Sequence, residues 1–272
     1  MRLSLTLTDY SWRGSPRDEL GAVAEAADSA GLDTLWVADH LLQADPAAPP
    51  NSAMLEAYTA LGYVAARTER IRLGAMVSPV FFRAPALLLK AVATVDALAG
   101  GRTWLGLGTG YNGEEAEATG LPFPSLRDRY ALLEDTLELA RRTWDGDGTP
   151  LSEPHPVERP RVLIGGMGER RTLKLVAEHA DACNLFDIPD GGRTIRHKLD
   201  VLRRHCEAAG RPYEEIEKTV STRLAAGEDA GAFAARCRDL EALGLDHAVV
   251  LNMGPWTRER VATLAAARAE VA

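Results

Sequence analysis

Short apolar segments alternate with amphipathic segments eight times along this chain of 272 residues. The short segments predict strands, and the segments between them repeat apolar residues at three- and four-residue spacing, which predicts helices. Strands are expected at 2–8, 34–38, 71–77, 103–107, 161–164, 182–186, 216–222 and 247–251. Strands that alternate with helices form a parallel sheet with right-handed crossovers. Eight such units predict an α/β fold, a single (β/α)8 or TIM barrel.

An open, doubly wound sheet is the competing architecture for the same pattern. The length favours the barrel, because a (β/α)8 barrel commonly uses about 250 residues as one unit. No linker or break in composition divides the chain, so we expect residues 1–272 to form a single domain. Few residues then remain to build a lid over the mouth of the barrel.

The charge balance restricts the partners of the chain. It has 31 Lys and Arg against 39 Asp and Glu, a formal net charge of -8, and its basic residues are scattered. Nucleic-acid binding requires clustered basic residues, so we expect no nucleic-acid partner. The apolar runs are too short to cross a bilayer, and no secretory signal opens the sequence. These features predict a soluble cytoplasmic protein with a small-molecule substrate and no membrane partner.

Cysteine and histidine spacing gives no sign of a metal site. Cys183, Cys206 and Cys237 are odd in number, widely separated and not part of a C-x-x-C motif. The six histidines form no H-x-x-x-H pair that could hold a metal on one helix face. We therefore predict neither a disulfide framework nor a bound metal.

In a barrel, reactive groups gather at the carboxyl ends of the strands. Asp39 and His40 follow the second predicted strand, and an imidazole there can donate or accept a proton during an oxidation or reduction. Successive strand residues point to opposite faces, so both side chains reach one site only if the backbone turns. Asp39 could instead cap the following loop, and His40 could be a hydrogen-bonded structural residue.

Two glycine-rich turns are candidates for binding a phosphate. Gly165-Gly166-Met167-Gly168-Glu169 lies between a strand and a helix, where backbone N–H groups and the helix dipole favour an anion. The same glycines could merely allow a tight turn with positive φ. Gly108-Thr109-Gly110-Tyr111-Asn112-Gly113 matches G-x-G-x-x-G, but it opens the fourth unit, and Glu114, Glu115 and Glu117 would crowd a pyrophosphate.

Several short motifs, in this order and spacing, resemble the bacterial luciferase-like flavin or deazaflavin oxidoreductases. They are Leu35-Trp36-Val37-Ala38-Asp39-His40, Thr68-Glu69-Arg70-Ile71-Arg72-Leu73-Gly74, Phe82-Arg83-Ala84-Pro85, Gly101-Arg102 with Leu105-Gly106-Leu107-Gly108-Thr109-Gly110, and Ile164-Gly165-Gly166 with Ala180-Asp181. The resemblance runs from residue 2 to about 187. Features between Arg204 and His247 look similar to members that use coenzyme F420.

The resemblance implies a barrel whose mouth holds the tricyclic ring of the cofactor. It implies that the phosphate of the ribityl arm binds the Gly165–Glu169 turn, that Asp39 approaches the ribityl group or ring edge, and that His40 donates or orients a proton. It also implies a non-proline cis peptide near Ala75-Met76, and it places Ala75, Met76, Thr109 and Gly110 among the cofactor-binding residues. Tyr111 stands where some sugar-phosphate-oxidising relatives have an acid.

We therefore expect an oxidoreductase that transfers a hydride between coenzyme F420 and an organic substrate. The alternatives are an FMN-dependent monooxygenase, in which reduced flavin activates O₂, and a cofactor-binding barrel that acts as a non-catalytic companion subunit. The resemblance also suggests a homodimer. Because the chain is acidic, an anionic cofactor would depend on backbone donors and on arginines such as Arg83.

Overall fold

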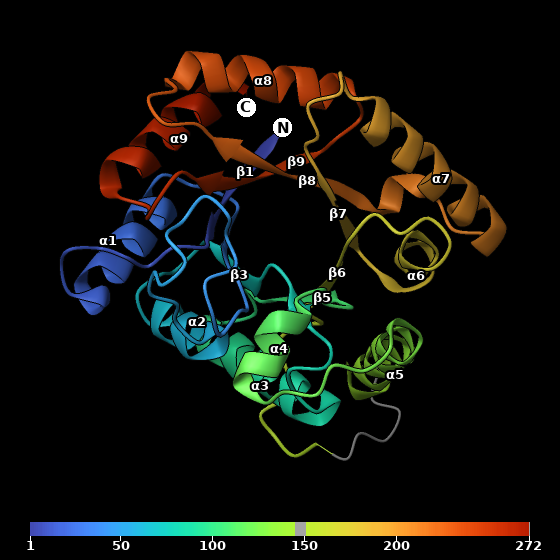
Figure 1. Ribbon diagram of the computed structural model, residues 1–272. Coiled ribbons are helices and arrows are strands. Elements are labelled where there is room, and N and C mark those ends of the chain that lie inside the picture. The colour runs from blue at the N-terminus through green and yellow to red at the C-terminus, as the bar shows by residue number, and fades with distance from the viewer. Residues whose placement is uncertain (145–150, 272) are drawn as a thin grey trace.

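The computed structural model describes residues 1–144 and 151–271, and its strands form a closed parallel barrel surrounded by helices (Figure 1). Nine strands pair in the order β3-β2-β1-β9-β8-β7-β6-β5-β4. The strands at the two ends of this order, β3 and β4, are consecutive in the chain. A parallel bridge between Leu73 and Thr103 joins β3 to β5 and closes the ring. The predicted (β/α)8 barrel is confirmed.

The elements alternate as the sequence pattern predicts. The strands are β1 (Arg2–Leu7), β2 (Thr34–Val37), β3 (Arg72–Ala75), β4 (Ser78–Pro79), β5 (Trp104–Gly108), β6 (Arg161–Gly165), β7 (Ala182–Phe186), β8 (Glu217–Leu224) and β9 (His247–Asn252). The helices are α1 (Pro16–Ser29), α2 (Ala57–Ala65), α3 (Pro85–Ala99), α4 (Gly113–Thr119), α5 (Leu126–Trp144), α6 (Thr172–His179), α7 (Arg193–Ala209), α8 (Ala230–Ala242) and α9 (Arg258–Val271), with a 3₁₀ turn at Tyr213–Glu215.

The third predicted strand is interrupted. The segment 71–77 forms β3, and β4 follows after a break at a cis peptide bond between Met76 and Val77. This bond lies one position further along the chain than the expected site near Ala75-Met76. The carbonyl oxygen of Ala75 points at Gly106 of β5, where a Cβ atom would overlap it. Gly106 thus allows the interrupted strand to lie against β5.

Helix α4 was not expected from the sequence. The last glycine of the G-x-G-x-x-G match begins this helix, and the Asn112 side chain caps it by accepting from the Glu115 N–H at 3.1 Å. Glu114 and Glu115 lie in the first turn, where a negative charge suits the helix dipole. Carboxylates and an Asn cap therefore stabilise a helix directly after the G-x-G-x-x-G match.

A small cluster of apolar side chains fills the barrel below its mouth. Trp36, Trp104, Leu163, Ala182 and Val249 come from five different strands, and Met76 and Val77 pack against them. The Trp36 and Trp104 rings lie 5.6 Å apart between centroids, and the Trp36 indole donates to Ser4 Oγ at 3.1 Å. The interior is thus a packed core with a floor beneath the mouth. A larger apolar layer lies between the strands and the surrounding helices.

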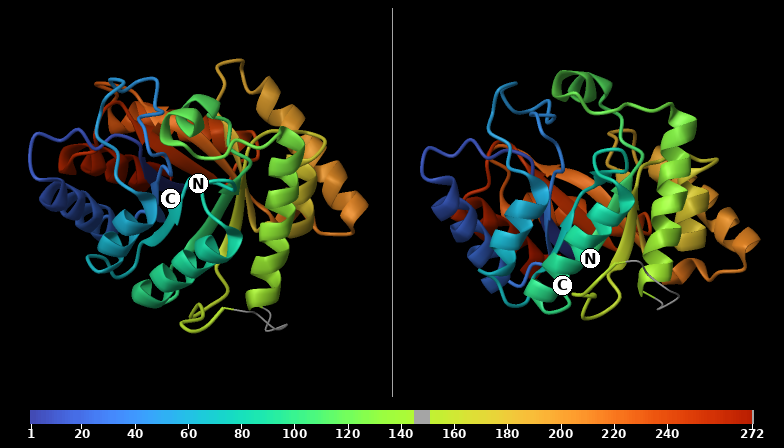
Figure 2. Two further views of the ribbon diagram at one scale, coloured as in Figure 1. Left: turned by 60° about the horizontal axis from the view of Figure 1, so that its bottom comes forward. Right: turned by 90° about the horizontal axis from the view of Figure 1, so that it is seen from below.

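The two ends of the barrel differ in character. In the right-hand view of Figure 2, α4 and the loop after β2 lie at one end of the barrel, and both termini lie toward the other end. The first end carries the carboxyl ends of the strands and is the mouth. Within residues 1–144 and 151–271, the helices lack either the length or the apolar character needed to span a bilayer.

A buried ion pair near the opposite end makes the barrel sensitive to acid. Glu217 accepts from His247 Nδ1 at 2.7 Å, and Arg2 and Arg161 each approach its carboxylate to 2.9 Å. Burial alone would raise the pKa of Glu217, but His247 and the two arginines outweigh it and lower the pKa to about 2. Because the folded pKa is depressed, the stabilisation is complete above pH about 4.5 and is lost as the pH falls through about 2.

We expect the depressed pKa of Glu217 to account for about 3 kcal/mol of the unfolding free energy that is lost in acid. Urea unfolding between pH 6 and pH 2 should show a smaller fall in the free energy of unfolding for Glu217→Gln than for the parent protein. Glu178→Gln, which removes a surface pair with Lys174, is the control and should follow the parent curve. Parallel curves for Glu217→Gln and the parent protein would contradict the assignment.

Candidate active site

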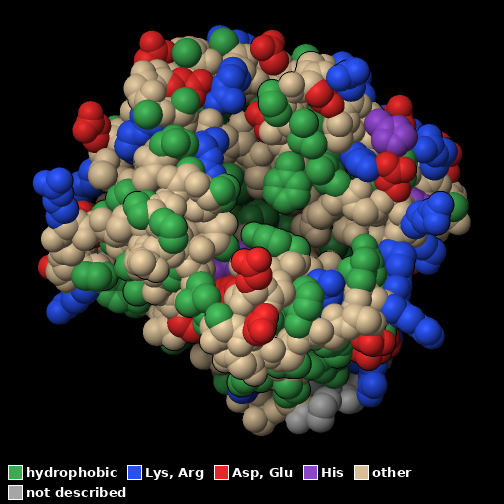
Figure 3. Space-filling model, in the orientation of Figure 1, with side chains coloured by type: hydrophobic (Ala, Val, Ile, Leu, Met, Phe, Trp, Pro, Cys, Tyr) green, Lys and Arg blue, Asp and Glu red, His purple; other side chains and the backbone are tan. Residues whose placement is uncertain are grey.

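A cavity of about 740 Å³ opens at the mouth of the barrel. Figure 3 shows the hollow at the centre of this face. Its lining includes residues within or just after each of the nine strands, for example Thr8, His40, Gly108, Gly165, Asn184 and Leu251. Active sites of (β/α)8 barrels lie at this end. The mouth is therefore the candidate active site.

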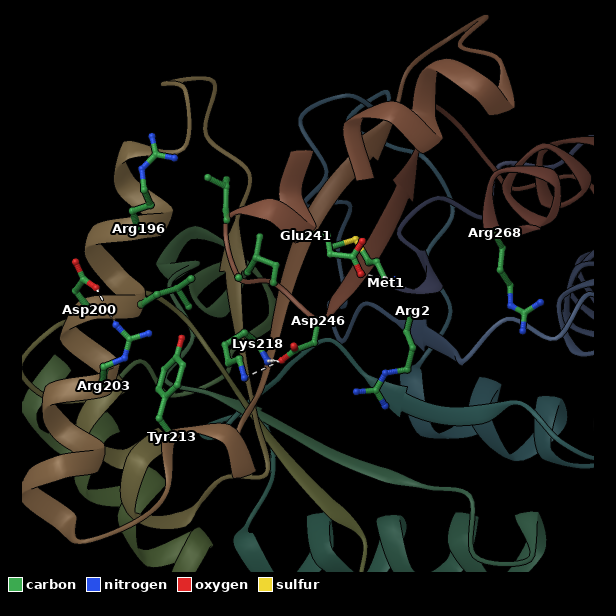
Figure 4. Close-up of a pocket in the computed structure, with 14 residues that line it drawn as sticks. Met1, Arg2, Arg196, Asp200, Arg203, Tyr213, Lys218, Glu241, Asp246 and Arg268 are labelled. Carbon is green, nitrogen blue, oxygen red and sulfur yellow. Dashed lines mark hydrogen bonds and ion pairs between the residues drawn. The ribbon is translucent and has the colours of Figure 1, made fainter. Parts of the chain in front are cut away.

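A second cavity, of about 680 Å³, lies at the other end of the barrel. Figure 4 shows Arg196 and Arg203 of α7 on one side of it and Arg268 of α9 on the other. Three ion pairs lie in its wall, between Lys218 and Asp246 at 3.0 Å, between Arg203 and Asp200 at 3.4 Å, and between the amino terminus of Met1 and Glu241 at 2.8 Å. Residues at the amino-terminal end of a barrel commonly serve stability. We assign no reaction to this cavity.

His40 lies in the mouth and is held by a buried carboxylate. Its Nδ1 lies 2.6 Å from Glu115 Oε2, and Glu115 Oε1 accepts the backbone N–H groups of Leu41 at 2.6 Å and Leu42 at 3.0 Å. A carboxylate accepts hydrogen bonds, so an ionised Glu115 would favour the His40 tautomer that carries its proton on Nδ1. The described residues engage only this ring nitrogen, so Nε2 is left for a ligand in the cavity.

The pairing explains the position of the His40 ring. Glu115 is only 2% exposed and comes from α4, 75 positions further along the chain. The rings of Tyr111 and Phe82 meet the imidazole edge to face, at centroid distances of 5.9 Å and 6.5 Å. Sequence reasoning missed Glu115 as a site residue, although three glutamates directly after a glycine turn at a strand end were a usable signal.

Asp39 is buried beside the site rather than inside it. Its carboxylate accepts from Ser78 Oγ at 2.6 Å and from Arg83 Nη1 and Nη2 at 2.6 Å and 3.0 Å. It is not part of the cavity lining. Only His40 of this pair lines the cavity, because adjacent residues at the strand end point to opposite sides, and the approach of Asp39 to a cofactor stays a prediction.

Arg83 binds two carboxylates. Besides its two hydrogen bonds to Asp39, it donates to Glu56 at 2.5 Å. Its guanidinium lies 4.9 Å from the centre of the Tyr58 ring. Burial opposes protonation, but Asp39 and Glu56 outweigh it and raise the pKa of Arg83. With two carboxylates bound to it, Arg83 joins β2 to the start of α2.

The turn after β6 divides into two parts. Gly165 and Gly166 line the cavity, and Gly166 has a φ of 121°, which favours glycine. Met167, Gly168 and Glu169 continue toward α6 outside the lining, and within the described chain their N–H groups have no hydrogen-bond acceptor. The carboxylate of Glu169 binds Lys198 at 2.5 Å and His197 at 3.0 Å, and these contacts lower its pKa. Its charge therefore points toward α7.

The other predicted cofactor-binding residues also divide into those that line the cavity and those that do not. Met76, Thr109 and Gly110 line the cavity. Ala75 is buried in β3 and does not. A Cβ atom at Gly108 would lie 2.7 Å from the Val77 side chain, so glycine is required where the strand ends meet below the mouth.

The fold and the cavity define a (β/α)8 barrel with a ligand site at its mouth. The chain belongs to the luciferase-like monooxygenase family, whose family model matches residues 3–270. Among curated relatives, the F420-dependent glucose-6-phosphate dehydrogenase of Kineococcus radiotolerans is 31% identical over 229 residues, which is 78% of this chain. The match covers 65% of the length of that relative, so the chain spans less than two thirds of it.

Solved structures with the same fold include enzymes of different chemistry. An F420-dependent secondary alcohol dehydrogenase, in complex with an F420-acetone adduct, superposes with a TM-score of 0.84, at 16% identity, over 100% of this chain and 99% of its own. The monooxygenase RslO1 from Streptomyces bottropensis superposes with a TM-score of 0.78, at 18% identity, over 97% of this chain and 98% of its own. At these identities the likeness establishes the fold alone.

The Glu115 contact gives a prediction about His40. Glu115→Gln keeps one oxygen for the two backbone N–H groups, but its amide nitrogen cannot accept from Nδ1, so the imidazole loses its preferred proton position. We expect turnover to fall about 10- to 100-fold with unchanged cofactor affinity. Steady-state kinetics and cofactor titration measure both. Glu114→Gln, in the same helix turn, is the control, and full turnover by Glu115→Gln would contradict the role.

Proposed function

We propose that the protein is an F420-dependent oxidoreductase that transfers a hydride between coenzyme F420 and an organic small molecule. The observation that carries this proposal is the free Nε2 of His40 at the mouth, held by Glu115 opposite the glycine turn after β6. The F420-dependent relatives reported above support the choice of cofactor.

The residues at the mouth fit such a cofactor. The N–H groups of Met167, Gly168 and Glu169, free of acceptors in the described chain, precede α6, and this is an arrangement that binds phosphate. Thr6 Oγ1 is buried on the cavity wall without a partner, so it can bond a ring or ribityl oxygen. Met76 and Val77 give the cavity an apolar wall for a flat ring.

Bound F420 would supply the hydride donor or acceptor. The chain itself handles the proton: Nε2 of His40 accepts one when an alcohol is oxidised, or donates one when a carbonyl is reduced. Glu115 fixes the ring and stabilises the positive charge that His40 gains. Asp39 and Arg83 hold the segment that carries His40 in place.

Titration of the purified protein with F420 and with FMN, followed by fluorescence quenching, tests the cofactor. We expect micromolar binding of F420 and none of FMN. Tight FMN binding with O₂ consumption would instead favour the monooxygenase. Binding of F420 without turnover of any alcohol or carbonyl compound would favour a non-catalytic companion subunit.

A homodimer and a cytoplasmic location also remain proposals. Leu87 and Leu98 on α3 are 60% and 65% exposed, which supports a self-association surface on that helix. Light scattering coupled to size-exclusion chromatography tests the dimer, and Leu98→Glu should shift it toward monomer. Cell fractionation tests the location.

A further inference from the structure

The rim of the mouth is apolar. Six large apolar side chains, each between 37% and 73% exposed, follow four different strands: Leu41, Leu42, Tyr111, Phe186, Ile188 and Met253. Figure 3 shows hydrophobic side chains gathered around the central hollow. Exposed apolar residues that cluster around a cavity commonly mark a ligand site.

The apolar character continues inside the cavity. Its wall includes Met54, Phe81, Phe82 and Leu251. Phe81 and Phe82 stack edge to face at 5.1 Å, and Phe82 also contacts the His40 ring. A substrate carbon beside His40 would therefore be surrounded largely by hydrocarbon.

The cations that line the cavity are already neutralised. In the described chain these are Arg223 and Arg236. Arg223 binds both oxygens of Asp45, at 2.9 Å and 3.1 Å. Arg236 binds both oxygens of Glu228, at 2.9 Å and 3.1 Å, and lies 3.7 Å from Asp187.

These pairs leave an excess of negative charge around the cavity. Asp45, Asp187 and Glu115 line it, against two arginines. A phosphorylated substrate would meet this excess without a free cation to bind. The free N–H groups before α6 could hold only one phosphate, and the proposed cofactor uses them.

We propose that the substrate is an uncharged molecule with an apolar body, such as a medium-chain secondary alcohol or its ketone, and not a sugar phosphate. The reaction is taken from the proposed function, on which this inference rests. The substrate class is inferred from the apolar rim and from the arginines that are already paired with carboxylates. With oxidised F420 as the acceptor of the hydride from the alcohol carbon, Nε2 of His40 would take the hydroxyl proton and a ketone would form. Glucose-6-phosphate dehydrogenases are thus relatives whose named substrate this chain does not share.

Calorimetric titration with 2-octanone, acetone and glucose 6-phosphate tests the proposal, with and without F420. We expect 2-octanone to bind at least tenfold more tightly than acetone, and glucose 6-phosphate to show no saturable binding. The double variant Phe186→Ser/Ile188→Ser should weaken 2-octanone binding about tenfold and leave F420 affinity unchanged. Val157→Ser, an exposed apolar residue that precedes β6 at the other end of the barrel, is the matched control.

Two results would overturn the proposal. One is glucose 6-phosphate binding as tightly as 2-octanone, and the other is a rim variant that binds 2-octanone like the parent. Failure of F420 to bind contradicts the proposed function instead, and the ligand series on the protein without cofactor still decides the substrate class.

Discussion

Replacing His40 by alanine is expected to lower turnover about 10²- to 10⁴-fold, because the variant loses the group that exchanges a proton with the substrate. Steady-state kinetics with saturating cofactor and substrate measures the loss. Affinity for F420 should change little, since the proposed phosphate site is the turn after β6 and His40 follows β2. The effect on kcat, and not on cofactor binding, separates a chemical role from a structural one.

The matched control is His155→Ala, which changes an exposed histidine away from the mouth. It should keep the turnover of the parent protein. A His40→Asn variant keeps a polar side chain of smaller size, and it should be as slow as His40→Ala because an amide does not accept a proton. Full turnover by either His40 variant would remove the proton-transfer role.

Substitution of Gly106 by alanine is expected to destabilise the barrel by about 4 kcal/mol. The new Cβ would overlap the carbonyl oxygen of Ala75, and carbon–oxygen contacts normally keep about 3.3 Å. Relief requires that β3 moves away from β5, where the single bridge between Leu73 and Thr103 closes the ring. The midpoint of thermal unfolding should fall by about 10 °C, measured by circular dichroism.

Gly62→Ala in α2 is the control for this change. No atom lies within 4 Å of a Cβ at Gly62, and alanine favours a helix interior. We expect it to raise stability by up to about 1 kcal/mol. If Gly106→Ala unfolds at the same temperature as the parent protein, the close approach of Ala75 does not limit the packing of this part of the barrel.

Much of the fold could be predicted from local patterns in the sequence. Short apolar or alternating segments and periods of three to four residues predicted eight of the nine strands and most helices, because burial acts within each element. The pattern failed at 71–79, where a mostly apolar run forms two strands on either side of a cis peptide bond. It also failed at α4, where an Asn cap and favourable helix charges outweighed the glycines.

The candidate active site could be predicted only in part from the sequence. His40, Met76, Thr109, Gly110, Gly165 and Gly166 line the cavity as expected. The ion pair between Asp39 and Arg83 was not predicted, and their contact with a cofactor stays a prediction. Sequence order shows that a charged residue follows a strand, and it does not show which neighbour neutralises it. That one domain spans residues 1–272 stays a prediction.

The number and order of the strand–helix units, and hence the barrel and its mouth, follow from the sequence, since each unit depends on the periodicity of a short segment. The contact of His40 with Glu115, the pairing of Arg223 with Asp45 and the apolar rim depend on the tertiary structure. Arg223 and Asp45, for example, are 178 positions apart and meet only when the ring of strands closes. Closure decides which charges cancel, and the charges that remain determine what the mouth can bind.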